Sequence, residues 1–140
     1  MISVATWILW VHLLGAAVWL GGAATALVAI LPAEGQARAL AMRRAHFLTS
    51  RAMEVVVLTG LLNLLAKGLA SSFAMSRGFF AMLAIKMVLL VGMAGLQIWM
   101  GLAWKRAEGG DPVWRSRVGL FAQCLLGAGA ALLGLGLRVV

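Results

Sequence analysis

Few residues in this chain could do chemistry, because only two histidines, one cysteine and four acidic residues occur among 140 positions. His12, Asn63 and Lys86 interrupt otherwise apolar segments. An ionisable group at the centre of a membrane helix costs at least about 2.5–3.5 kcal/mol, so each one needs a partner or a function. A neutral imidazole is a common ligand of metal ions and of haem iron. We therefore expect His12 to ligate a metal or haem, to hydrogen-bond a neighbouring helix, or to transfer protons.

Small residues follow His12 along one face of its segment. Gly15, Ala16 and Trp19 lie three, four and seven positions beyond the histidine, a spacing that places them on the same side of a helix. Gly15 and Ala16 are small enough to leave a shallow groove beside the histidine. We expect this groove, which Trp19 borders, to receive either a flat ligand or another helix.

Lys86 and Asn63 are predicted to lie at a membrane depth similar to that of His12. Counted from the predicted helix starts, His12 lies eight residues in, about 12 Å, and Lys86 seven residues in, about 10 Å. The three side chains could therefore converge on one site. A Lys86 ammonium suits an anion such as a haem propionate or a quinone oxygen, or it snorkels to the headgroups. Met82, one turn earlier, either fills a gap in the bundle or ligates Cu(I) as a soft donor.

A second polar set is expected nearer the opposite membrane face: His46, Arg51, Glu54, Gln97 and Gln123. Arg51 and Glu54 stand at i and i+3, so we expect them to pair, with anchoring of a quinone headgroup or propionate as the alternative for Arg51. His46 is expected at the membrane boundary, in contact with solvent. Because His12 and His46 lie near opposite faces, they are not expected to ligate one iron within a single chain. A second axial ligand would come from another copy, a partner subunit or Met82.

The sequence lacks the residue patterns of several enzyme classes. The only aspartate lies in a predicted loop, and no Ser/His/Asp arrangement or glycine-rich phosphate loop is present. The single cysteine, Cys124, cannot form an internal disulfide. A non-enzymatic role is therefore favoured. The net charge of +8 does not indicate nucleic-acid binding, because the basic residues cluster between apolar segments, where they meet anionic headgroups.

The composition is that of a membrane protein, with 64% hydrophobic and 11% charged residues, against about 45–50% and 25% in soluble domains. Four apolar segments, at about 4–31, 48–68, 79–104 and 117–137, are each long enough to span a bilayer. Short connections predict an all-α, up-down-up-down bundle forming one domain over residues 1–140. A stripe on the fourth segment is expected to pack closely against other helices: Gly119, Gln123, Gly127, Ala130 and Gly134.

The distribution of lysine and arginine predicts the orientation of the bundle. The first connection carries Arg38, Arg43 and Arg44, and the third carries four basic residues between 105 and 117. The second connection carries only Lys67 and Arg77. By the positive-inside rule, the first and third connections face the cytoplasm and both termini lie on the outer, periplasmic side. We expect a multi-pass protein of a bacterial inner membrane.

Several short motifs resemble the copper resistance protein D (CopD) family. They are Trp7-x4-His12-Leu-Leu-Gly-Ala-Ala-Val-Trp19-Leu-Gly-Gly22 with Leu31-Pro32, then Thr59-Gly-Leu-Leu-Asn63, and Ile85-Lys86-Met-Val-Leu-Leu. The resemblance implies an inner-membrane helical bundle associated with copper uptake or delivery. The length and the first-helix histidine also resemble the HemJ-type protoporphyrinogen oxidases, which implies haem b. The sequence departs from that second pattern after Leu31-Pro32, where Ala33-Glu34-Gly35 follows.

Three functions follow as hypotheses. The first is a CopD-like protein that binds a redox metal around His12, with Asn63 and Lys86 tuning the site and Met82 as a soft ligand. The second is a haem b electron-transfer subunit near the quinone pool, in which Gly15, Trp19 and Lys86 or Arg51 surround the cofactor. The third is a structural accessory subunit without a cofactor. Each is compatible with a homo-oligomer or with a place in a larger membrane complex.

Overall fold

The computed structural model describes residues 3–72, 76–106 and 113–136. Within these ranges the chain is all-helical: α1 (Val4–Thr25) continues into a π-helical turn, η1 (Ala26–Ile30), and is followed by α2 (Gly35–Ala70), α3 (Arg77–Arg106) and α4 (Val113–Gly136). Four helical stretches are long and apolar enough to cross a membrane, the first of them formed by α1 and η1 together. The protein is thus a small multi-pass membrane protein, as its composition predicts.

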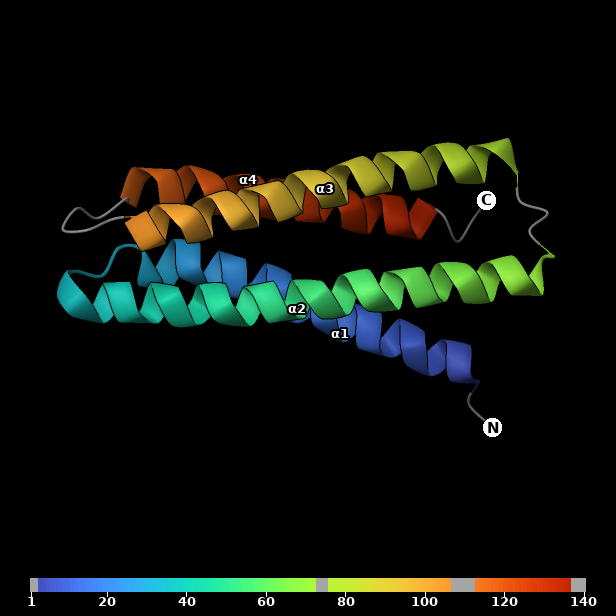
Figure 1. Cartoon of the computed structure of the whole chain (residues 1–140), viewed down its shortest axis with the longest axis horizontal. Coiled ribbons are helices and arrows are strands. Elements are labelled where there is room, and N and C mark those ends of the chain that lie inside the picture. The colour runs from blue at the N-terminus through green and yellow to red at the C-terminus, as the bar shows by residue number, and fades with distance from the viewer. Residues whose placement is uncertain (1–2, 73–75, 107–112, 137–140) are drawn as a thin grey trace.

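The helices pack as an antiparallel bundle of two hairpins. Figure 1 shows the start of α1, the end of α2, the start of α3 and the end of α4 at one end of the molecule, and the start of α2 and of α4 at the other. The most extensive packing joins α1 to α2 and α3 to α4, and α2 touches α3 only sparsely. This arrangement confirms the predicted up-down-up-down order, and it places both ends of the described chain on one side.

The ends of the first helix follow from local sequence. Ser3 caps α1, since its Oγ accepts a hydrogen bond from the Thr6 amide at 3.2 Å. At the other end, the Leu31 amide donates a hydrogen bond of 2.9 Å to the carbonyl of Ala26, five residues earlier, which is the pattern of a π-helical turn. Pro32 follows directly and has no amide hydrogen with which to extend the helix. Gly35, with a positive φ of 68°, then redirects the chain into α2.

The predicted start of the second helix is wrong. We expect a loop through Arg38, Arg43 and Arg44, with the helix beginning near residue 48, whereas α2 begins at Gly35. No proline or glycine occurs between this glycine and Gly60, so nothing in the intervening sequence breaks a helix. The basic residues mark the membrane boundary without ending the helix. The other predicted boundaries agree with the structure within a few residues.

The core of the bundle is thin and mostly apolar. Two clusters of buried side chains fill it: Ala23, Ala26, Leu31, Met42, Met100 and Leu120 in one, and Trp19, Ala52, Met53 and Met93 in the other. Large apolar side chains also cover the outside, including Val88 and Leu132, which are 71% and 69% exposed. Helices with such an apolar outer surface are stable in a lipid bilayer and would not be stable in water.

Candidate functional site

His12 is held against α2 by its ring nitrogen. His12 Nδ1 lies 3.0 Å from the Val56 carbonyl oxygen and 3.0 Å from Thr59 Oγ1. A carbonyl can only accept, and the Thr59 hydroxyl donates to the Val55 carbonyl at 2.6 Å, so Nδ1 carries the hydrogen and donates it to Val56. In a neutral ring the lone pair is then on Nε2. A hydrogen bond from the other ring nitrogen to a backbone carbonyl is how metal-ligating histidines are commonly oriented.

Gly60 makes room for the imidazole. A Cβ atom at this position would lie 3.3 Å from His12 Cε1, closer than ordinary van der Waals contact. Gly60 therefore lets the ring approach α2 closely while Nδ1 reaches the Val56 carbonyl of the same helix. The Thr59-Gly60 pair of the second-helix motif thus positions His12, a role that sequence spacing alone does not reveal.

Of the residues expected around His12, Lys86 of α3 is half-buried, and its Nζ lies 3.5 Å from the position that a Cβ on Gly134 of α4 would occupy. Asn63 is half-buried one turn beyond Thr59, and no hydrogen bond joins it to His12 or Lys86 within the described residues. Met82 is half-buried one turn before Lys86 on α3.

Gly15 and Trp19 take part in helix packing. A Cβ on Gly15 would meet Val56 and Val55 side-chain atoms at 3.1 and 3.3 Å, so α2 occupies the groove beside His12. Of the two occupants that the sequence left open, the structure places a helix there. Trp19 is 5% exposed, and its ring fills the space above Gly127 of α4, where a Cβ would lie 2.7 Å from Trp19 Cζ3.

A second polar cluster, the glutamine network, connects three helices: His46, Thr49 and Ser50 of α2, Gln97 of α3 and Gln123 of α4. Gln97 Nε2 lies 2.9 Å from Thr49 Oγ1 and 3.0 Å from Ser50 Oγ. Gln123 Nε2 donates to Gln97 Oε1. Gln97 is 5% exposed and Gln123 is fully buried. Hydrogen bonds of this kind hold membrane helices together.

His46, predicted at the membrane boundary in contact with solvent, is half-buried and contacts α3. Its Nδ1 lies 3.2 Å from Gln97 Nε2, and its carbonyl accepts from the Thr49 hydroxyl at 3.1 Å. The ring packs over Gly101, where a Cβ would lie 2.6 Å from His46 Nε2. Because α2 begins 13 residues earlier than predicted, His46 lies well inside that helix and faces α3.

A small cavity adjoins the glutamine network. Its volume is about 10 Å³, and its lining is Ala26, Met42, Ala45, His46, Thr49, Met100, Leu120 and Gln123. This is room for about one water molecule. Gln123 Oε1 is buried and has no hydrogen-bond partner among the described residues. The cavity is too small for a cofactor.

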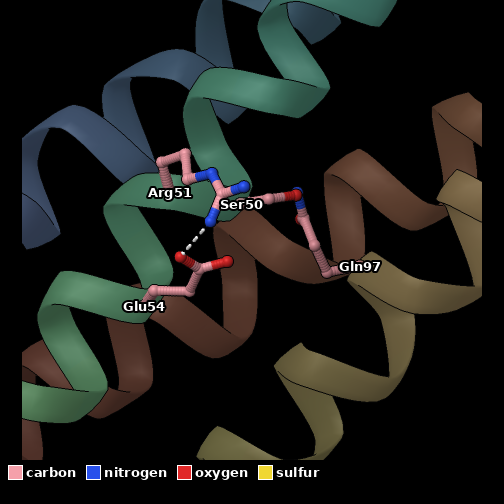
Figure 2. Close-up of polar contacts among 4 residues, drawn as sticks. All are labelled: Ser50, Arg51, Glu54 and Gln97. Atoms are coloured by element: carbon pink, nitrogen blue, oxygen red, sulfur yellow. Dashed lines mark hydrogen bonds and ion pairs between the residues drawn. The ribbon is translucent and has the colours of Figure 1, made fainter.

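Arg51 and Glu54 form the predicted ion pair. Arg51 Nη1 lies 2.7 Å from Glu54 Oε2, and both side chains are 62% exposed. The guanidinium also lies over the Phe47 ring at 5.4 Å. Figure 2 shows the pair running along α2 beside Ser50, which points toward Gln97. The pair therefore lies on the outside of the bundle, next to the interior glutamine network.

Neither the metal-donor side chains of the described residues nor the comparisons with known proteins assign a cofactor to this chain. Within the described residues, no group of three or more His, Cys, Asp and Glu side chains could hold a metal ion. The comparisons with family models, with curated proteins and with solved structures give no match to this chain. The motif resemblances to the CopD and HemJ-type families therefore stay predictions. The proposed function therefore rests on the hydrogen bond and the packing of His12.

Proposed function

We propose that this membrane protein binds a redox centre through His12 Nε2. The observation that carries the proposal is the hydrogen bond from Nδ1 to the Val56 carbonyl, which fixes the tautomer and leaves the Nε2 lone pair for a ligand. Thr59 and Gly60 support it, since they orient the ring and make room for it. The same hydrogen bond also meets the expectation that His12 joins neighbouring helices, so ligation at Nε2 is the step that the experiment below tests.

One imidazole and one amine on a neighbouring helix suit haem b better than a bare copper ion, and because α2 fills the groove beside Gly15, the haem would approach His12 from outside that groove. The imidazole matches a single axial ligand, and the amine, when protonated, is a counter-charge for haem propionates. A copper ion needs further donors, and a protonated Lys86 would repel it. Haem b, when bound, supplies one-electron redox chemistry. His12 would hold the iron, Lys86 would neutralise a propionate, and the second axial ligand would come from another copy or a partner subunit.

Copper handling is the second candidate, and Met82 is the observation that favours it. Met82 and Lys86 stand at i and i+4 on α3, so they share one side of that helix. A thioether beside an imidazole is a donor pair that suits Cu(I). In that case Lys86 would tune the metal site or gate access to it.

The test compares the two histidines. Purified His12→Ala protein should lose its haem or copper, while His46→Gln, which keeps an acceptor for Gln97, should retain the wild-type content per chain. Met82→Leu should lower copper content and leave haem content unchanged. Equal cofactor content in wild type and His12→Ala would overturn the proposal. Wild-type protein that carries neither cofactor and co-purifies with one partner would support the accessory-subunit function instead.

A further inference from the structure

The side-chain amide of Gln97 has one orientation that suits its neighbours on α2. Its nitrogen, Nε2, lies 3.3 Å from the His46 carbonyl oxygen and 2.9 Å from Thr49 Oγ1. A carbonyl oxygen can only accept a hydrogen bond, and the Thr49 hydroxyl already donates its hydrogen to that same carbonyl at 3.1 Å. The part of the amide that faces α2 must therefore be the NH₂ donor, and Gln97 Oε1 is left for α4.

The orientation of Gln97 fixes the amide of Gln123 as well. Because Gln97 Oε1 is an acceptor, the atom of Gln123 that contacts it must be the donor, Nε2. Turning the Gln123 amide over would bring two acceptor oxygens together. Gln123 Oε1 is thereby directed away from Gln97, and it is buried with no hydrogen-bond partner among the described residues. A buried acceptor of this kind is destabilising unless a donor reaches it.

The small cavity beside the glutamine network brings a second acceptor to the same place. Gln123 and Thr49 both line this cavity, and its volume of about 10 Å³ is room for one water molecule. Thr49 Oγ1 donates one hydrogen bond and accepts one from Gln97, which leaves it one lone pair. A hard cation such as Mg²⁺ or Ca²⁺ needs about six oxygen ligands, and the lining side chains supply only the oxygens of Gln123 and Thr49. The cavity therefore suits a small neutral donor.

We propose that this cavity binds one water molecule, which donates one hydrogen to Gln123 Oε1 and the other to Thr49 Oγ1. Gln123 Oε1 then gains the donor that it lacks, and the water has the two polar partners that it needs to stay in a cavity. The water connects α4 to α2, two helices that do not pack directly on each other within the described residues. Water, Thr49, Gln97 and Gln123 form a closed ring of hydrogen bonds across three helices.

Substitution of Ala45, which also lines the cavity, tests the proposal by the sign of its effect. Ala45→Val places methyl groups where the water lies, so Gln123 Oε1 loses its donor. The midpoint of thermal unfolding in detergent should fall by at least about 3 °C. Filling a dry cavity would raise the midpoint instead. Ala45→Ser is the matched control, because its hydroxyl takes the place of the water as a donor, and it should unfold close to the wild-type midpoint.

The same substitution in Gln123→Met protein separates loss of the water from crowding. Methionine is similar in length to glutamine and has no oxygen acceptor, so Ala45→Val in this background should leave the midpoint unchanged or raise it. An equal fall in both backgrounds would indicate overpacking alone. A rise in the wild-type background would indicate a dry cavity. Either result would overturn the proposal.

A crystal structure of the wild-type protein, grown in a lipidic phase and at a resolution that shows ordered water, locates the molecule directly. Density for one water is expected at about 2.5–3.0 Å from both Gln123 Oε1 and Thr49 Oγ1. A cavity without density, or one closed by a turned Gln123 amide, would contradict the proposed site.

Discussion

At the scale of single residues, the polar groups inside this bundle divide into two arrangements with different chemistry. His12 makes one directed hydrogen bond to α2 through Nδ1, and the proposed function assigns its Nε2 to a ligand. The glutamine network instead uses its amides to bond one helix to the next. The sequence locates these residues at the right helices, but it does not separate a ligating role from a packing role. That distinction depends on which atom of each side chain is already engaged.

The glutamine network should contribute measurably to stability. Gln97→Leu should lower the free energy of unfolding by about 1–2 kcal/mol, because it removes bonds to Thr49, Ser50 and Gln123 at once. Gln123→Leu alone should cost less, and the double variant should cost less than the two single effects added together. Denaturation of the detergent-solubilised protein measures all three. Gln36→Leu, at the exposed start of α2, is the control, and equal effects at positions 36 and 97 would refute the network's role.

At the scale of helices, the sequence predicted the number, type and order of elements, because each apolar segment is long enough to span a membrane on its own. The prediction was wrong where it used polar residues to place the start of a helix. Arg38, Arg43 and Arg44 suggested a loop, although they lie in good helix-forming sequence. The register that sets His46 against Gln97 comes from packing between helices, which no single segment encodes.

The predicted close packing of α4 is confirmed by its glycines. A Cβ on Gly127 would lie 2.7 Å from Trp19 and 3.0 Å from Leu20, whereas a Cβ on Gly129 would have nothing within 4 Å. Gly127→Ala should therefore destabilise the bundle by about 1–3 kcal/mol through overpacking. Gly129→Ala, two residues away, should be neutral or stabilise by up to about 1 kcal/mol. Thermal unfolding in detergent compares them, and an equal loss of stability in both variants would argue against the α1–α4 contact.

At the scale of the whole molecule, the antiparallel bundle places its most basic segments together. The start of α2, with Arg38, Arg43 and Arg44, lies at the same end as the start of α4, with Arg115 and Arg117 (Figure 1). This clustering is what the positive-inside rule requires of a cytoplasmic end. The sequence therefore predicts an orientation that is consistent with the fold, with both termini on the outer side.

Reporter fusions test this orientation. Alkaline phosphatase, which is active only outside the cytoplasm, should be active when fused to the C-terminus and inactive when fused after Glu34. A fluorescent protein that becomes fluorescent only in the cytoplasm should give the opposite pattern. The same fusions to protein with Arg43→Ala and Arg44→Ala should show a mixed orientation, because these changes remove two positive charges at the first boundary. The reverse pattern in the unsubstituted chain would contradict the predicted orientation.

The central claim is that His12 Nε2 ligates a redox centre, and one measurement addresses it most directly. The absorbance spectrum of detergent-purified wild-type protein is recorded oxidised and then dithionite-reduced, with iron and copper determined on the same sample. We predict a Soret band, a sharp α-band on reduction and iron in proportion to the haem. A featureless spectrum with bound copper would keep the His12 site and replace haem b with copper. A featureless spectrum with neither metal would contradict the claim.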